Sequence, residues 1–118
     1  MHPYKRSQRL SVLLKEEVAD IVLHKIKNPR LGFITVTDVE LSDDLRFAKI
    51  FVTVLKEEDR EISLQILNEA KGFVRSEIAK RLRIKIIPNF EFFYDESIER
   101  GFRIDKLLED IKKTSEGI

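Results

Sequence analysis

The chain has 118 residues, of which 42% are apolar and 36% are charged, and its formal net charge is +1. This length fits one domain with a core of its own, and the balance of apolar and charged residues excludes a disordered chain. No segment approaches the roughly 20 apolar residues that a membrane helix needs, and the basic start at residues 1–9 does not resemble a secretory signal. The absence of cysteine excludes disulfides and zinc–thiolate sites. We therefore expect a cytoplasmic protein with no membrane partner.

The small net charge conceals four blocks of alternating sign. Residues 1–30 and 70–90 carry net charges of +4 and +5, whereas residues 31–69 and 91–118 carry −5 and −3. Two separate basic segments predict a polarised surface that can steer a polyanion onto one face of the molecule. The alternative is that the charges of a small domain segregate without a function.

The first half of the chain predicts a helix followed by a β-hairpin. An apolar stripe at helical spacing covers about residues 7–27 and stops at Asn28-Pro29. β-branched residues predict a strand over residues 33–41, and alternating apolar residues predict a second strand over about residues 46–55. Between them, Ser42-Asp43-Asp44 is typical of a turn, because these side chains hydrogen-bond the local backbone.

A long helical pattern follows, with apolar residues spaced four apart from Ile62 to Leu82. Gly72 lies in its interior, where glycine costs about 1 kcal/mol relative to alanine. We therefore predict a helix kink at Ala70-Lys71-Gly72, with the bend itself at Gly72. The alternative is a glycine that is kept for packing.

The end of the chain contains two further predicted elements. Residues 83–87 are ambiguous between strand and loop, and residues 90–95 form a short aromatic strand. Ser97 is placed to cap a last helix, whose apolar stripe covers residues 104–111. The predicted fold is α+β, a single domain in the order α-β-β-α-α-β-α with helices on one face of a three-stranded sheet.

Candidates for catalysis or metal binding are few. Neither histidine, His2 or His24, has a motif partner, and no phosphate-binding, zinc-protease or serine-hydrolase motif occurs. A turn explains Asp43-Asp44, and the start of a helix explains Asp95-Glu96. We therefore expect no enzyme, no metal site and no cofactor.

Several short strings, in a fixed order, resemble those of one family. The element order is that of the type II K-homology fold, in which a Gly-x-x-Gly loop between two helices clamps nucleic-acid backbone. Here Ala70-Lys71-Gly72 stands in place of that loop. Together with Asn28-Pro29-Arg30-Leu31, Ser42-Asp43-Asp44-Leu45 and Asp95-Glu96-Ser97, it makes residues 4–112 similar to the ribosome-binding factor A family.

The resemblance implies a bacterial assembly factor for the small ribosomal subunit. It predicts a single K-homology-like ribosome-binding domain over residues 1–118, of which residues 1–6 and 113–118 are expected to be flexible. Such a factor binds the immature 30S subunit and its 16S rRNA, and it assists maturation of the 5′ end of that RNA, especially in the cold. It is not a nuclease, it needs no cofactor, and we expect it to be a monomer when free.

In the K-homology arrangement, the kink lies where the clamping loop would be. We expect the basic residues around and after the kink to be the main phosphate contacts; these are Lys71, Arg75, Lys80, Arg81, Arg83 and Lys85. Lys5, Arg6 and Arg9 would form a secondary contact that is ordered only on the ribosome. Without a Gly-x-x-Gly loop, we expect recognition by charge and shape rather than by base identity. The alternative is a solvated basic face.

Two other functions fit the sequence. One is a permanent protein of the small subunit, which would co-sediment with mature subunits, whereas an assembly factor is found on immature ones. The other is a protein-binding or ligand-sensing α+β module without an RNA role. Salt dependence separates this module from an RNA-binding protein, because phosphate neutralisation makes RNA affinity fall steeply with salt.

Overall fold

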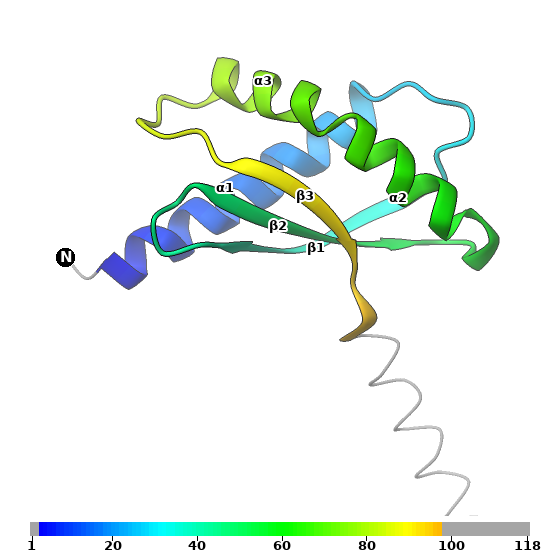
Figure 1. The fold of residues 1–118 in the computed structure, drawn as a ribbon, viewed down its shortest axis with the longest axis horizontal. Helices are drawn as coiled ribbons and strands as arrows, with labels where there is room; N and C mark the ends of the chain where they lie inside the picture. The colour runs from blue at the N-terminus through cyan, green and yellow to red at the C-terminus, as the bar shows by residue number, and fades with distance from the viewer. Residues whose placement is uncertain (1–2, 98–118) are drawn as a thin grey trace, which may run out of the picture.

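The computed structural model describes the backbone of residues 3–97 and the side chains of residues 8–97. Along the chain lie α1 (Pro3–His24), β1 (Ile34–Leu41), β2 (Phe47–Val54), the 3-10 helix η1 (Glu57–Asp59), α2 (Arg60–Glu69), α3 (Lys71–Arg81) and β3 (Asn89–Tyr94) (Figure 1). This order confirms the predicted α-β-β-α-α-β arrangement. Residues 82–88 form a loop. The predicted last helix and residues 113–118 lie outside the described residues.

The sheet has the strand order β1-β2-β3, so β2 is its centre. β1 runs antiparallel to β2, and β3 runs parallel to β2 after the crossover through α2 and α3. Figure 1 shows the three α-helices on one side of this sheet. No helix among residues 3–97 is long and apolar enough to cross a membrane.

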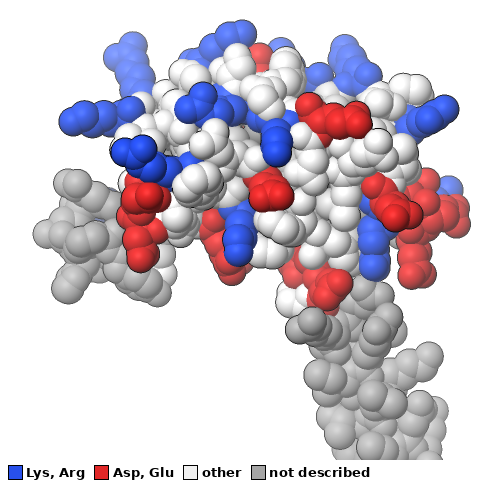
Figure 2. Space-filling model, in the orientation of Figure 1, with Lys and Arg blue, Asp and Glu red and all other residues white. Residues whose placement is uncertain are grey.

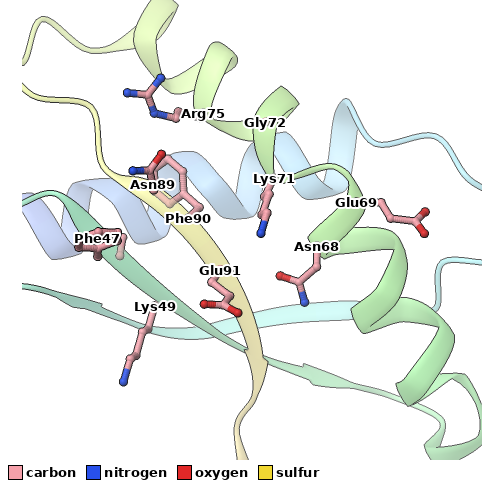
Figure 3. A pocket seen from close by; sticks show the side chains of 11 residues that line it. Phe47, Lys49, Asn68, Glu69, Lys71, Gly72, Arg75, Asn89, Phe90 and Glu91 are labelled. Atoms are coloured by element: carbon pink, nitrogen blue, oxygen red, sulfur yellow. The ribbon is translucent and has the colours of Figure 1, made fainter.

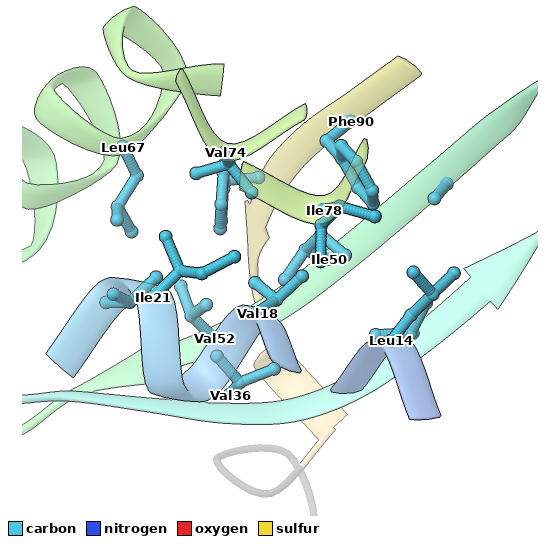
Figure 4. Packing of buried hydrophobic residues seen from close by; sticks show 14 residues of the cluster. Leu14, Val18, Ile21, Val36, Ile50, Val52, Leu67, Val74, Ile78 and Phe90 are labelled. Atoms are coloured by element: carbon cyan, nitrogen blue, oxygen red, sulfur yellow. The ribbon is translucent and has the colours of Figure 1, made fainter. Parts of the chain in front are cut away.

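The core lies between the sheet and the helices. Every second side chain of β2 is buried, as the alternating pattern predicts, and the helices contribute their apolar stripes from the opposite side. The members with no exposed surface include Leu14, Val18, Ile21, Ile50, Val52, Leu67, Val74 and Ile78 (Figure 4). Complete burial of one such aliphatic side chain contributes about 1.5–3 kcal/mol. The core therefore holds all three helices on β2 and its neighbours.

A β-bulge at Thr37 interrupts the alternation of β1. Val36 pairs with Val52 and Asp38 pairs with Phe51, which leaves Thr37 as the extra residue. Val36 and Val39 are therefore both buried although they are three residues apart. Thr37 Oγ1 donates a hydrogen bond of 2.6 Å to Asp95 Oδ2, just after β3.

The structure corrects the predicted cap at the end of β3. Asp95 Oδ1 accepts the backbone N–H of Ser97 at 2.9 Å, so Asp95 rather than Ser97 caps the turn that follows. Hydrogen bonds from the side chains of Ser97 and Thr37 hold the pKa of Asp95 below its ordinary value. The carboxylate of Asp95 is thus committed to ordering the chain at this point.

The helical pattern over residues 60–81 is interrupted, but not at the predicted residue. α2 ends at Glu69, and Ala70, with φ −90° and ψ 3°, separates it from α3. Gly72 lies inside the first turn of α3, and its φ is not positive. The interruption lies within the predicted kink Ala70-Lys71-Gly72, but the bend itself is at Ala70 and not at Gly72, since the non-helical backbone angles belong to Ala70.

An ion-pair cluster joins α1 to the end of α3. Arg81 Nη1 donates to Glu17 Oε2 at 3.0 Å and to Asp20 Oδ2 at 2.6 Å. The hydrogen bond from Arg81, with a smaller contribution from His24, lowers the pKa of Asp20, and the two carboxylates raise the pKa of Arg81. This cluster connects elements that are about 60 residues apart in sequence.

Replacement of Gly72 by alanine tests the role of this glycine in the folded chain. Apart from its chain neighbours and the backbone of its own helix, no heavy atom lies within 4 Å of the position that an alanine Cβ would occupy. Gly72→Ala is therefore expected to raise the free energy of unfolding by about 0.5–1 kcal/mol, because alanine restricts the unfolded chain and favours helix. Urea unfolding measures this change. A loss of stability would show that the glycine serves the fold.

The Arg81 cluster predicts a pH-dependent contribution to stability. The folded-state pKa of Asp20 is lowered, so the stabilisation is present above the ordinary aspartate pKa of about 3.9 and is lost as pH falls through the folded-state value. Arg81→Met should therefore unfold more easily than the wild type at pH 7, and the difference should shrink below about pH 4. The exposed Lys15 of α1 forms no ion pair within residues 8–97, so Lys15→Met is a control with no such pH dependence. A difference for Arg81→Met that does not change with pH would contradict this role.

Candidate nucleic-acid interface

The interruption at Ala70 forms a turn that both helices share. The Ala70 N–H donates to the carbonyl groups of Ile66 and Leu67, and the Ala70 carbonyl accepts the N–H of Val74. No side chain caps the start of α3. The first N–H groups of a helix carry partial positive charge, which favours an anion near that end.

Asn68 attaches this turn to the sheet. Its Oδ1 accepts the N–H of Phe92 at 2.9 Å, and its Nδ2 donates to the carbonyl of Phe92 at 3.1 Å. The carboxamide thus replaces a strand partner on the free edge of β3. The sequence analysis did not identify Asn68. The only sequence feature that could have indicated it is a polar side chain two residues before the interruption at Ala70.

A cavity with a volume of about 680 Å³ lies between the turn and the sheet (Figure 3). β2, α2, α3 and β3 all contribute to its lining, which consists of Phe47, Ala48, Lys49, Asn68, Glu69, Lys71, Gly72, Arg75, Asn89, Phe90 and Glu91. Figure 3 shows Lys71 pointing from the start of α3 toward β3, whereas Lys49 lies at the far edge and points away from α3. The cavity brings together Lys71, Gly72 and Arg75 of the predicted site with strand residues that the sequence did not indicate.

Arg75 has a second role in the folded chain. Its Nη2 donates to the carbonyl of Ile87 at 3.1 Å, which holds the 82–88 loop against α3. The side chain is nevertheless exposed. Arg75 can therefore present its remaining donors to a ligand while it orders the loop.

The other predicted cations divide into exposed and paired residues. Lys80, Arg83 and Lys85 are exposed on α3 and the 82–88 loop, and Lys80 approaches Glu77 at 3.6 Å. Arg81 differs, because its side chain is only 23% exposed and contacts two carboxylates. Figure 2 shows Lys and Arg along the upper edge of the view, where α3 and this loop lie in Figure 1. Arg81 therefore stabilises the helix packing and is a poor candidate for a phosphate contact.

Lys5, Arg6 and Arg9 belong to α1, which begins at Pro3. The backbone of these three residues is therefore helical, and the flexibility of residues 1–6 stays a prediction. Arg9 is exposed. Figure 1 shows the start of α1 at the same end of the long axis as the 82–88 loop. The structure thus places the secondary contact predicted from the sequence at the end of the molecule where Arg83 and Lys85 lie.

Of the adjacent carboxylates Asp43 and Asp44, Asp44 is used by the turn. Asp44 Oδ1 accepts hydrogen bonds from Ser42 Oγ at 2.7 Å and from the Arg46 N–H at 3.1 Å, which confirms the predicted turn. The hydrogen bond from Ser42 is the main reason that the pKa of Asp44 is lowered. Within residues 8–97, no three His, Cys, Asp or Glu side chains are grouped so that they could hold a metal ion.

Comparisons with known proteins agree with this fold. A sequence model of the family described as Ribosome-binding factor A matches residues 6–108. The ribosome-binding factor A of Thermodesulfovibrio yellowstonii is 80% identical over 118 residues, which are 100% of both chains. The crystal structure of ribosome-binding factor A from Thermus thermophilus superposes with a TM-score of 0.67 at 30% identity, covering 75% of this chain and 94% of that chain.

A further similar structure comes from a complex with a ribosomal subunit. The Thermus thermophilus ribosome-binding factor A homology model fitted into a cryo-EM map of its 30S complex has a TM-score of 0.63 at 29% identity, covering 73% of this chain and 91% of that chain. These likenesses confirm the predicted K-homology-like fold. With the match over residues 6–108 and the 80% identity of a full-length relative, the chain belongs to the ribosome-binding factor A family.

Proposed function

We propose that this protein is an assembly factor that binds the immature 30S subunit through its 16S rRNA. The observation that carries the proposal is the exposed basic surface of α3 and the following loop, which we call the α3 surface: Lys71, Arg75, Lys80, Arg83 and Lys85. Within the described residues, Lys71, Arg83 and Lys85 form no ion pair, so their charges are available to phosphate. The Thermus thermophilus factor in a 30S complex supports the same partner for this chain.

Gly72 supports a ligand at the start of α3. Neither the backbone conformation nor the packing around residue 72 requires glycine, and the residue borders the cavity beside Lys71. Glycine permits close approach to the backbone, which a phosphate needs to reach the N–H groups of a helix start. A nucleic-acid backbone bound there would explain why residue 72 is glycine, which the fold alone does not require.

The proposed factor acts by binding rather than by chemistry. A ligand shifts a conformational equilibrium by its different affinities for the two states. Binding to one arrangement of the immature 16S rRNA would increase its population and so assist maturation of the 5′ end. Such a factor works as a monomer in the cytoplasm, where the subunit is assembled, and it needs no cofactor.

Charge reversal on the α3 surface tests the proposal. Lys80→Glu/Arg83→Glu should weaken binding to purified immature 30S subunits and should flatten the plot of log K against log salt by about one for each phosphate that is no longer neutralised. Equilibrium binding at several salt concentrations measures both effects. The loss of affinity should be largest at low salt, because the interactions with phosphate are electrostatic.

The matched control is Lys15→Glu/Lys56→Glu, which changes the net charge equally at two exposed residues outside the α3 surface. It should bind nearly as the wild type does, with a similar salt slope. If both double variants lost the same amount of affinity, the effect would come from net charge and not from the α3 surface. Wild-type binding that does not depend on salt would favour a protein-binding module without an RNA role.

A further inference from the structure

Several large apolar side chains are exposed on the face of the sheet opposite the helices, where polar residues are expected. Figure 1 shows no described helix on this side. A strand with one solvated face normally alternates apolar and polar residues. Here five large apolar side chains point outward from the strands or from their ends, between polar residues such as Lys49 and Thr53; these are Phe33, Phe47, Phe51, Leu55 and Phe93, which we call the outer strip.

The outer strip follows β2 along its length. Phe47, Phe51 and Leu55 are spaced four residues apart, and Phe51 lies beside Phe93 with 6.0 Å between ring centroids. The Leu55 N–H donates to the Phe33 carbonyl at 3.0 Å, so these two residues are also neighbours. Exposed fractions of 76% for Leu55, 65% for Phe33 and 59% for Phe47 show that no described part of the chain covers them. Large exposed apolar side chains repeated along one strand in this way favour an interaction site.

Acidic residues flank the outer strip. Asp38 is the cross-strand partner of Phe51, and Lys49 lies between Glu40 on β1 and Glu91 on β3. Lys49 Nζ is 5.8 Å from the centroid of the Phe93 ring, so the only cation within β1, β2 and β3 is held over an aromatic ring, and Arg46 and Lys56 lie just beyond the ends of β2. Three carboxylates against one ammonium group repel phosphate and attract a cationic partner.

We propose that the outer strip binds a basic protein segment, one that presents apolar side chains to the strip and lysine or arginine to Asp38, Glu40 and Glu91. Aromatic side chains surrounded by charged residues are typical of the centre of a protein interface. The inference rests on the proposed function. The partner would be a basic protein of the small subunit that lies beside the bound rRNA. The two faces of the domain would then bind different components, RNA at the α3 surface and protein at the outer strip, and they meet at the edge of the cavity, which Phe47, Lys49 and Glu91 also line.

The test replaces the most exposed members of the strip and compares two ligands. Phe33→Thr/Leu55→Thr places β-branched residues beside the sheet and removes two side chains that are mostly exposed, so folding should be preserved. We expect about tenfold weaker binding to intact immature 30S subunits and unchanged binding to deproteinised 16S rRNA. The Lys80→Glu/Arg83→Glu variant should instead lose affinity for both ligands.

The matched control is Val12→Gln/Leu23→Gln, which removes two similarly exposed apolar side chains from α1. It should bind both ligands as the wild type does. Wild-type affinity of the Phe33→Thr/Leu55→Thr variant for intact subunits would overturn the proposal, as would parallel losses for subunits and bare rRNA. New protease cleavage within residues 98–118 of that variant, without loss of subunit binding, would assign the strip to the chain's own C-terminal segment and also overturn it. Failure of the wild type to bind either ligand would instead refute the proposed function.

Discussion

The structure depends on the burial of alternate side chains of β2 beneath three helices. Ala48, Ile50, Val52 and Val54 are buried from one end of this strand to the other, and β2 is the only strand in the described sheet with a neighbour on each side. A shift of one residue in β2 would expose these four side chains and bury the outward set instead. The same alternation therefore determines the core, the uncovered face and the position of every helix.

The interruption at Ala70 divides one helical pattern into two helices with different neighbours. Because the helix stops and restarts there, α2 can attach to the edge of β3 through Asn68 while α3 continues over β3 and alongside α1. The start of α3 then opens onto the cavity, and its exposed side carries the basic residues. The Arg81 cluster fixes the other end of α3 to α1. Both ends of the basic helix are thus held in place before any ligand binds, which reduces the entropic cost of binding.

The strongly periodic parts of the fold could be predicted from the sequence. Apolar residues that recur every two positions predict the strands of the hairpin, and those that recur about every four positions predict the helices. Both patterns identify the buried side of an element, so the one-sided sheet could be predicted as well. The bulge at Thr37 could not be predicted in this way, because Thr37 Oγ1 bonds Asp95 from the far end of the chain. The position of the helix interruption depends on the same kind of distant contact, since Asn68 holds the preceding turn to Phe92.

The candidate site was predictable as a charge pattern but not as a geometry. Net charge over residues 70–90 indicated a basic segment, but it could not separate Lys80, whose side chain is 71% exposed, from Arg81, whose side chain is 23% exposed. That distinction requires the partners of Arg81, which lie on α1. The outer strip was hidden for a related reason, because a phenylalanine in a strand predicts a core residue until the register shows which face it occupies.

The central claim is that the α3 surface contacts RNA on the small subunit, and site-specific photo-cross-linking tests it most directly. Phe73 is exposed on α3 beside Gly72, and Phe33 is exposed on the opposite side of the sheet. A photoreactive phenylalanine analogue can replace either residue with little change in shape, and the complex with immature 30S subunits can then be irradiated and the 16S rRNA mapped. RNA cross-links are expected from position 73 and none from position 33. RNA cross-links from position 33 alone, or from neither position in a complex that has formed, would contradict the claim.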